Sequence, residues 1–286
     1  MRVLDNFSTG KRENLEPLIH QFDKNQLEIL EGDMRDSACV EEAVRGVEVI
    51  FHQAAFVSVP QSVAEPQTCF DVNIKGTSLL FDSARQAGVR RAVVASSAAI
   101  YGNSDALPLV EETPPQPMSP YAVSKRVKEM YAELFTSSYG LEAVALRYFN
   151  VYGPRQRPDS MYAAAVPIFA RRLLDGRPVT IFGDGGQTRD LINVRDVVRA
   201  NLIAAKHRRA AGKIFNICTG LEMRLLDLLE VMYKLIPNTP LHEFAAPRAG
   251  DVYRSVGSPQ KAADVMGFRA EVSLADGLKE VIDSMR

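Results

Sequence analysis

The sequence has few cysteines, almost no net charge and no long apolar run, and each shortage excludes a class of protein. Cys39, Cys69 and Cys218 are scattered and odd in number, which argues against a disulfide framework or a cysteine metal site and predicts reduced thiols. The net charge of −1, from 34 basic and 35 acidic residues, argues against a nucleic-acid binder that relies on bulk charge. No apolar run reaches the ~18 residues of a membrane span, and the opening MRVLDN has no apolar stretch typical of a signal peptide. We therefore expect a cytoplasmic protein that binds neither nucleic acid nor membrane and holds no metal.

Short apolar runs alternate with longer helical patterns along the chain. The patterns predict strands at 2–4, 27–30, 47–52, 91–96, 142–147 and 213–217, and helices at 37–45, 68–86, 120–138, 167–174, 194–206 and 225–235. This alternation is typical of an α/β fold with a doubly wound parallel sheet. We predict one domain over residues 1–153, with a sheet completed by residues 191–219, and a smaller, proline-punctuated region over 154–286.

Three residues in two segments indicate oxidation chemistry at an alcohol carbon. Ser97 closes a predicted strand, and Tyr121 and Lys125 lie four positions apart at the start of a predicted helix, so they point from one face. A nearby ammonium stabilises a phenolate, which lets the tyrosine accept a hydroxyl proton while a hydride leaves the same carbon. An exposed Tyr–Lys pair would be the ordinary explanation for Tyr121 and Lys125 alone, but Ser97 upstream favours the catalytic one.

Residues after the first predicted strands are suited to a dinucleotide. Asp5 follows the first predicted strand of this chain. An acidic residue at the end of the second strand of a dinucleotide fold binds the ribose hydroxyls of adenosine and favours NAD over NADP. A plain turn residue is the alternative for Asp5. Asp33 follows the next strand, and Ala54 and Ala55 follow the third, where small residues let backbone approach a cofactor.

The glycine-rich turn of dinucleotide folds is not in this sequence. That turn normally lies about 20 residues before the acidic residue, whereas Asp5 has only four residues before it. The 183–186 loop is a poor substitute, because QTRD after it does not open an apolar helix. We therefore expect the first strand, turn and helix to be missing from the chain. A misplaced start is the favoured explanation, and a truncated, inactive protein is the alternative.

Taken together, the motifs resemble those of extended short-chain dehydrogenases/reductases, and most of all those of NAD-dependent nucleotide-sugar epimerases of the UDP-galactose 4-epimerase type. The resemblance covers essentially the whole chain. It rests on LDNFSTG at 4–10, GD at 32–33, HQAA at 52–55, NIKGT at 73–77, SSAAIYG at 96–102, YAVSK at 121–125, RYFNVYGP at 147–154, GDG at 183–185, TRD at 188–190 and RAGD at 248–251.

The resemblance implies a role for each matching position. It implies a Rossmann-like NAD-binding domain with cofactor contacts from Asp5, Asn6, Asp33, Met34, Ala54, Ala55, Asn73, Tyr121, Lys125 and Tyr148. It implies a UDP-sugar substrate bound by Ser97, Asn150, Arg189, Arg248, Asp251 and Ser255. Two arginine forks suit a diphosphate, although either arginine alone could be a solvated surface charge.

The implied reaction is epimerisation at C4 of a UDP-hexose through a transient 4-keto sugar. Related dehydratases place an acid just after the position of Ser97, but Ala98–Ile100 supplies none, which disfavours dehydration without excluding it or a reductase. Ser255 stands where bulk limits the sugar C2 substituent in the epimerases, so the resemblance implies room for UDP-GlcNAc and UDP-GalNAc as well as UDP-Glc and UDP-Gal. Ser255 could instead be a helix cap or turn residue.

The predicted helices at 68–86 and 120–138 carry apolar residues on more than one face. Val123, Val127, Met130, Leu134 and Phe135 belong to the second of these helices. An internal core would explain them. The family analogue is a homodimer that pairs the two helices into a four-helix bundle, and we favour it.

Overall fold

The computed structural model describes residues 1–157, 165–247 and 252–286. They form two compact units, each of which is discontinuous in sequence. The first unit comprises 1–96, 117–145 and 210–213, and the second comprises 97–116, 146–209 and 214–286. The division into ligand-binding regions at residue 153 stays a prediction.

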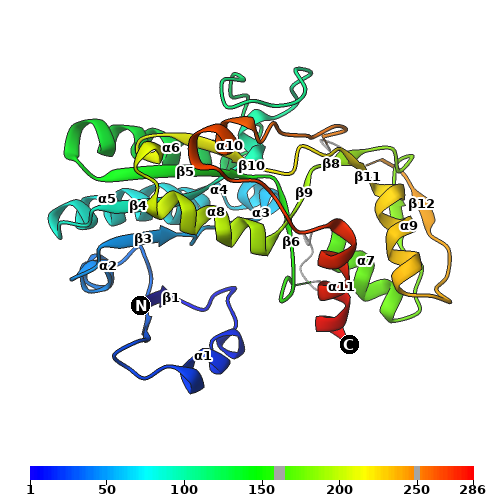
Figure 1. Cartoon of the computed structure of the whole chain (residues 1–286), viewed down its shortest axis with the longest axis horizontal. Coiled ribbons are helices and arrows are strands. Elements are labelled where there is room, and N and C mark those ends of the chain that lie inside the picture. Colours follow the sequence, from blue (N-terminus) through cyan, green and yellow to red (C-terminus); the bar gives the residue numbers. More distant parts are fainter. Residues whose placement is uncertain (158–164, 248–251) are drawn as a thin grey trace. The chain divides into compact units, whose positions relative to one another are not determined.

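The first unit holds the elements on which the predicted dinucleotide residues lie, except Tyr148, which belongs to the second unit (Figure 1). Its elements are β1 (Arg2–Asp5), α1 (Glu16–Gln21), β2 (Glu28–Glu31), α2 (Ser37–Val44), β3 (Val49–His52), α3 (Val59–Ala64), α4 (Pro66–Phe70), α5 (Gly76–Gln86), α6 (Pro120–Tyr139) and the larger parts of β4 (Arg91–Ser97) and β5 (Glu142–Tyr148). β1 and β2 pair in parallel, with Arg2 opposite Glu28. β3 and β4 also pair in parallel, with Val49 opposite Arg91.

The second unit holds the shorter strands and the carboxyl-terminal helices. They are β6 (Asn150–Tyr152), α7 (Ala165–Leu174), β7 (Thr180–Phe182), β8 (Thr188–Arg189), β9 (Leu191–Asn193), α8 (Val194–Lys206), β10 (Ile214–Ile217), β11 (Met223–Arg224), α9 (Leu225–Leu235), β12 (Glu243–Ala245), α10 (Gln260–Met266) and α11 (Leu274–Met285). The largest sheet has the order β10-β5-β4-β3. The predicted α/β fold with a parallel sheet is therefore confirmed.

Helix α6 has strong signals at both ends. Ser119 caps the helix, because its Oγ accepts from the Ala122 amide at 3.1 Å, and Pro120 occupies the first turn. Gly140 ends the helix in the left-handed conformation with φ of 74°, which glycine adopts at little cost. These signals fix where the helix begins, and they therefore place Tyr121 and Lys125 in its first two turns.

The helix predicted at 68–86 is interrupted by a wider turn. α4 and α5 are joined by a π-helical turn at Asp71–Lys75, labelled η2 in the element order. Such turns insert one extra residue per turn and are frequent at functional sites. Here the turn contains Asn73, whose side chain is fully buried.

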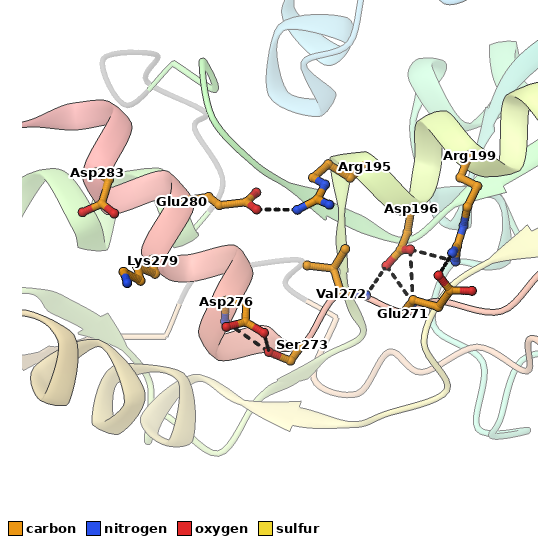
Figure 2. Close-up of a pocket in the computed structure, with 10 residues that line it drawn as sticks. All are labelled: Arg195, Asp196, Arg199, Glu271, Val272, Ser273, Asp276, Lys279, Glu280 and Asp283. Atoms are coloured by element: carbon orange, nitrogen blue, oxygen red, sulfur yellow. Dashed lines mark hydrogen bonds and ion pairs between the residues drawn. The ribbon is translucent and has the colours of Figure 1, made fainter.

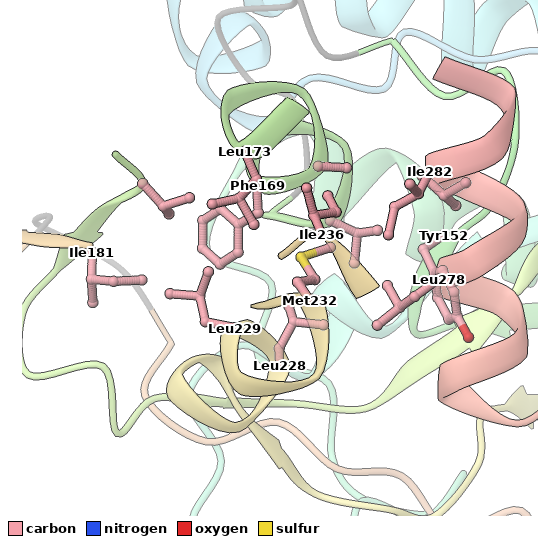
Figure 3. Close-up of a cluster of buried hydrophobic side chains, with 14 residues drawn as sticks. Tyr152, Phe169, Leu173, Ile181, Leu228, Leu229, Met232, Ile236, Leu278 and Ile282 are labelled. Atoms are coloured by element: carbon pink, nitrogen blue, oxygen red, sulfur yellow. The ribbon is translucent and has the colours of Figure 1, made fainter. Parts of the chain in front are cut away.

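The second unit is built around an apolar core of helices α7, α9 and α11 (Figure 3). Phe169 and Leu173 come from α7, Leu228 and Met232 from α9, and Leu278 and Ile282 from α11, with Tyr152 of β6 and Ile181 of β7 beside them. This core supports strands β6 and β7, whose residues reappear below in a pocket.

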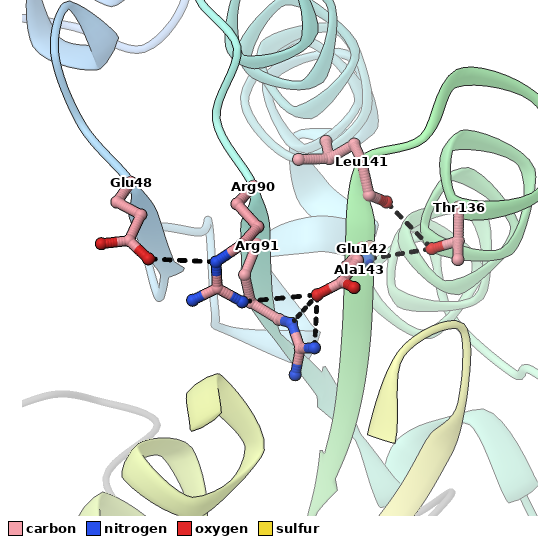
Figure 4. Close-up of polar contacts among 7 residues, drawn as sticks. All are labelled: Glu48, Arg90, Arg91, Thr136, Leu141, Glu142 and Ala143. Carbon is pink, nitrogen blue, oxygen red and sulfur yellow. Dashed lines mark hydrogen bonds and ion pairs between the residues drawn. The ribbon is translucent and has the colours of Figure 1, made fainter. Parts of the chain in front are cut away.

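Ion pairs connect the amino-terminal ends of β3, β4 and β5 (Figure 4). Arg91 is 1 % exposed, and its Nε donates to Glu142 Oε2 at 2.9 Å. Neighbouring Arg90 pairs with Glu48 at 3.0 Å on the surface. The hydrogen bond from Arg91 holds the pKa of Glu142 below its ordinary value of 4.5.

Replacing Glu142 by Gln is expected to lower the free energy of unfolding by about 1–2 kcal/mol at pH 7, because the buried Arg91 guanidinium loses its counter-charge. The effect is limited because the Glu142 carboxylate is partly exposed, so solvent screens the ion pair. A lowered carboxyl pKa stabilises the fold above the unfolded-state pKa, and this stabilisation disappears as the pH falls through the folded-state pKa. Urea unfolding at pH 7 and below pH 4 should therefore show the difference shrinking with acid. Glu48→Gln, on the exposed pair, is the control. A pH-independent difference would contradict the assignment.

Candidate active site

Tyr121 and Lys125 come together at the start of α6. The Lys125 side chain is 2 % exposed, its Nζ donates to the Ala95 carbonyl at 2.9 Å, and it lies 5.4 Å from the centroid of the Tyr121 ring. Burial lowers the pKa of Lys125 from 10.5 to about 8. The predicted pair is therefore assembled, with the amine fixed by the strand beneath it.

The backbone of Tyr121 is held by two serine hydroxyls. Its amide donates to Ser62 Oγ at 3.1 Å, and its carbonyl accepts from Ser124 Oγ at 2.7 Å. Ser124 Oγ in turn accepts from Asn73 Nδ2 at 2.9 Å. Segments from α3, η2 and α6 thus fix one residue of the first helical turn.

Asn73 extends this network to the loop after β3. Its Oδ1 accepts from the Phe56 amide at 2.7 Å and its Nδ2 donates to the Phe56 carbonyl at 3.0 Å. Its side chain is 0 % exposed, so its amide groups serve the protein itself. These bonds give Asn73 a positioning role, and the cofactor contact implied by the resemblance stays a prediction.

The residues after β1 and β2 form a polar cluster. Asn6 Nδ2 donates to Asp33 Oδ2 at 2.9 Å, and Arg35 Nη2 donates to the same oxygen at 2.7 Å. The hydrogen bond from Arg35 holds the pKa of Asp33 well below its ordinary value. Asp5 Oδ1 accepts from the Phe7 amide at 2.7 Å, so one of its oxygens closes the turn that follows.

The side chain of Met34 lies so close to Gly76 of the NIKGT motif that no larger residue fits at position 76. A Cβ at Gly76 would lie 2.8 Å from Met34 Cε, below any ordinary contact distance. Met34 is buried, whereas Ala54 is exposed and Ala55 half-buried immediately after β3. Charged groups and small side chains at the carboxyl ends of these strands fit the adenosine and ribose parts of a dinucleotide.

Ser97 belongs to the second unit. Its Oγ accepts from the Ala99 amide at 3.2 Å and caps the short helix Ala98–Tyr101. Tyr101 is fully buried below it, donating to Asn216 Oδ1 at 2.7 Å and accepting from Arg147 Nη1 at 2.8 Å. Burial raises the pKa of Tyr101 to about 12, so Tyr101 anchors this segment as a neutral phenol.

A pocket of about 410 Å³ in the second unit contains two predicted substrate residues. Asn150 and Arg189 line it. The other lining residues were not predicted: Val151, Tyr152, Ala165, Val166, Ile168, Phe169, Arg172, Thr180, Ile181, Phe182, Gln187, Leu191 and Leu225. A mostly apolar wall with a few charged groups fits a base and a phosphate-bearing ligand.

Through its carboxylate, Asp190 ties its own segment to two loops, one at Thr219 and Gly220 and one at Gly257. Its side chain is 0 % exposed and accepts from Thr219 N at 2.8 Å, Thr219 Oγ1 at 2.7 Å, Gly220 N at 2.9 Å and Gly257 N at 3.3 Å. Burial raises its pKa despite these bonds. Its own carbonyl accepts from the Asn150 amide at 3.0 Å, so the carboxylate fixes the surroundings of Asn150 and Arg189. The TRD motif contains Asp190, but the motif predicted no separate role for this residue.

The remaining predicted residues have varied surroundings. Tyr148 is hydrogen-bonded through its hydroxyl to the Asn201 side chain at 2.9 Å, and Ser255 is half-buried. Arg248 and Asp251 lie outside the described residues. Their roles stay predictions.

A second pocket, of about 720 Å³, lies between α8 and the start of α11 (Figure 2). Arg195 pairs with Glu280 at 2.5 Å, and Asp196 accepts from Arg199 at 3.0 Å and from the Val272 amide at 3.0 Å. These charges satisfy one another. None of the predicted site residues within the described ranges lines this pocket, so we do not assign the reaction to it.

Two features are absent from the described part of the chain. Within it, no group of histidine, cysteine and acidic side chains has the arrangement of a metal site. No helix there is long and apolar enough to cross a bilayer.

Comparison with known proteins identifies the relatives of this chain. Residues 1–218 match the NAD dependent epimerase/dehydratase family. The UDP-glucose 4-epimerase of Mycolicibacterium smegmatis is 37 % identical over 286 residues, covering 99 % of this chain and 90 % of the relative. The UDP-N-acetylglucosamine 4-epimerase of Methanobrevibacter ruminantium, solved with UDP-N-acetylmuramic acid, superposes with a TM-score of 0.93 at 34 % identity, covering 99 % and 89 % of the two chains. The Thermus thermophilus UDP-glucose 4-epimerase, solved with NAD, has a TM-score of 0.87 at 39 % identity, with coverage of 99 % and 90 %.

Replacing Asp190 by Asn is expected to lower the free energy of unfolding of the protein by about 2–4 kcal/mol, because an amide group would face backbone donors that now meet a carboxylate. Hydrogen exchange should rise at the amides of Thr219, Gly220 and Gly257. Asp283→Asn, on the surface of α11, is the control and should be nearly neutral. Unchanged exchange at the three amides would show that Asp190 does not hold these loops.

Proposed function

Because the chain belongs to the NAD-dependent epimerase/dehydratase family, we propose that it epimerises a UDP-hexose at C4, through a 4-keto sugar, with NAD as resident cofactor. The observation that carries this proposal is the buried Lys125 amine beside the ring of Tyr121, at the start of a helix whose first turn is anchored by Ser62 and Ser124.

NAD fits the residues of the first unit. Asp5, Asn6 and Asp33 would bind the adenosine end, and Met34 would lie beside the adenine. Ala54 and Ala55 would allow close approach of the dinucleotide. When bound, NAD supplies an acceptor for the hydride from C4 and returns that hydride to the opposite face of the sugar.

The protein residues handle the proton and the orientation of the sugar. Tyr121 would take the proton of the C4 hydroxyl and give it back after the sugar has turned. Lys125 would stabilise the phenolate and bind the nicotinamide ribose, and its hydrogen bond to Ala95 leaves further N–H groups for this. Ser97 would donate a hydrogen bond to the reacting oxygen, and Tyr148 would line the nicotinamide site.

The nucleotide would provide most of the substrate's binding energy. Arg189 and Arg248 would bind the diphosphate, Asn150 would contact the diphosphate–sugar region and Asp251 the uridine ribose. The 410 Å³ pocket supports this assignment, since Arg189 and Asn150 line it together with apolar side chains. Firm contacts to the nucleotide leave the hexose free to rotate, which epimerisation requires.

A dehydratase is the alternative within the same family. Elimination needs a proton donor close to the reacting carbons, and Ala98–Ile100 after Ser97 carries none. Ser255 supports room for an N-acetyl group at C2, so UDP-GlcNAc joins UDP-Glc as a proposed substrate.

Replacing Tyr121 by Phe is expected to reduce epimerisation by at least about 10³-fold while the copurified NAD stays bound, because general acid–base catalysis is lost and the fold is kept. Interconversion of UDP-Glc and UDP-Gal, and of UDP-GlcNAc and UDP-GalNAc, would be followed by chromatography. Tyr139→Phe, at the exposed end of the same helix, is the control. Turnover by Tyr121→Phe at the wild-type rate would refute the assigned base, and a 4-keto-6-deoxy product would favour the dehydratase.

We also propose that two copies of the chain pair through α6. Val123, Met130 and Leu134 are 44 %, 53 % and 48 % exposed and lie seven and four residues apart, so they form one apolar stripe on this helix. Phe70 of α4 is exposed as well. Pairing of α4–α5 and α6 with a second copy would cover these side chains in a four-helix bundle.

The double substitution Met130→Glu and Leu134→Glu is expected to convert a dimer into a monomer, because two carboxylates on each copy would be buried against each other. Light scattering after size-exclusion chromatography would measure the mass. Glu133→Gln, on the same helix, is the control. A monomeric wild-type protein, or a dimeric double variant, would contradict the proposed interface.

A cytoplasmic location is part of the same proposal. It is supported by Cys39, Cys69 and Cys218, which are all free thiols.

A further inference from the structure

Lys128 is a buried amine that the proposed reaction does not use. It lies three residues after Lys125 on α6, and its side chain is 0 % exposed. Its Nζ is 3.5 Å from the Ala54 carbonyl, at the long limit of a hydrogen bond. Burying a cation with so weak a partner costs several kcal/mol relative to water.

The groups around Lys128 are basic. His52 of β3 and Lys125 of α6 both interact electrostatically with Lys128. From α4, the Cys69 thiol faces Lys125. The buried carboxylate on α6, Glu129, is occupied by Ser96 at 2.6 Å and Arg126 at 3.1 Å. Among the described residues, no carboxylate forms an ion pair with Lys128.

The hydrogen bonds around His52 show that its Nε2 carries a proton and so cannot accept a hydrogen bond from Lys128. Thr77 donates its one hydroxyl proton to the Asn73 carbonyl at 2.6 Å. His52 Nε2, 2.9 Å from that hydroxyl oxygen, must therefore be the donor between them. Burial, followed by the charges of Lys128 and Lys125, lowers the pKa of His52 well below 6.5, and burial lowers that of Lys128 well below 10.5. Three buried basic groups thus lie close together, and burial disfavours their charged forms.

This arrangement becomes favourable when a negative charge arrives beside it. Ala54, the contact of Lys128, is exposed and stands at the carboxyl end of β3, where the dinucleotide is proposed to bind. Lys128 Nζ therefore lies close to the backbone of this segment, and an anionic group bound at Ala54 would meet a region already rich in basic nitrogen.

We propose that Lys128 is a positioning residue for the dinucleotide, whose amine takes up a proton from solvent when the diphosphate binds and then acts as its buried counter-charge. The inference rests on the proposed NAD site. It differs from the role of Lys125, which is assigned to the ribose and to Tyr121.

The test is calorimetric titration of NAD into the nucleotide-depleted protein at pH 7.5, in HEPES and in Tris. These buffers differ in ionisation enthalpy, so the difference in heat gives the number of protons taken up. The wild-type protein is expected to take up more protons per NAD than Lys128→Met, by linkage. The variant should bind NAD about ten-fold more weakly, as expected for loss of one charge-assisted contact. Lys213→Met, which removes an exposed lysine of the same unit, should match wild type.

Several outcomes separate the explanations. Equal proton uptake and equal affinity in Lys128→Met and wild type would overturn the proposal. Loss of the proton in His52→Gln but not in Lys128→Met would assign it to His52, and would also overturn it. Absence of NAD binding by the wild-type protein would refute the cofactor assignment and this inference together. NAD binding with the expected proton difference but no UDP-sugar turnover would uphold Lys128 and refute only the reaction. Should Lys128→Met fail to fold, as judged by circular dichroism, Lys128→Gln provides the same comparison.

Discussion

One buried amide sets the geometry of the first unit. The Asn73 side chain, enclosed in a π-helical turn, is hydrogen-bonded to both backbone groups of Phe56 and to Ser124, which holds the carbonyl of Tyr121. A buried amide stabilises a fold only when its groups are paired. Because these partners come from a loop and a second helix, the pairing is complete only when all three segments are in register. The position of the tyrosine is therefore a property of the packed core.

The same region concentrates basic groups where little water remains. Lys125 and Lys128 are both buried, yet the partners given by the structure are backbone carbonyls, of Ala95 and Ala54. Burial disfavours the charged forms of both amines, and a bound anion would favour them. Binding and catalysis would then draw on interactions that the protein cannot satisfy by itself, which is the usual condition of a site built for a charged ligand.

The regular elements were predictable because their signals are local. The helix over Val194–Lys206 and the helix over Leu225–Leu235 have the predicted bounds, and the strands are shifted by at most a few residues. The π-helical turn was not predicted, since one inserted residue leaves the apolar period almost unchanged. Short strands such as β7 and β12 were missed because three residues carry no readable period.

For the site, motif spacing led to Tyr121 and Lys125. Spacing could not indicate that Asn73 is enclosed or that Lys128 is buried beside Lys125, because both depend on contacts between distant segments. The lining residues of the 410 Å³ pocket were hidden for a similar reason, since Val166 and Phe169 also belong to an apolar core.

The contact between Gly76 and Met34 has an evolutionary consequence. Any side chain at 76 would enter the space of the methionine, whose Cε lies 2.8 Å from where a Cβ would stand. A residue larger than glycine at position 76 thus requires a residue smaller than methionine at position 34. Across related sequences these two sites should vary as a pair, and a lineage that changes one without the other would have to move the second strand relative to helix α5.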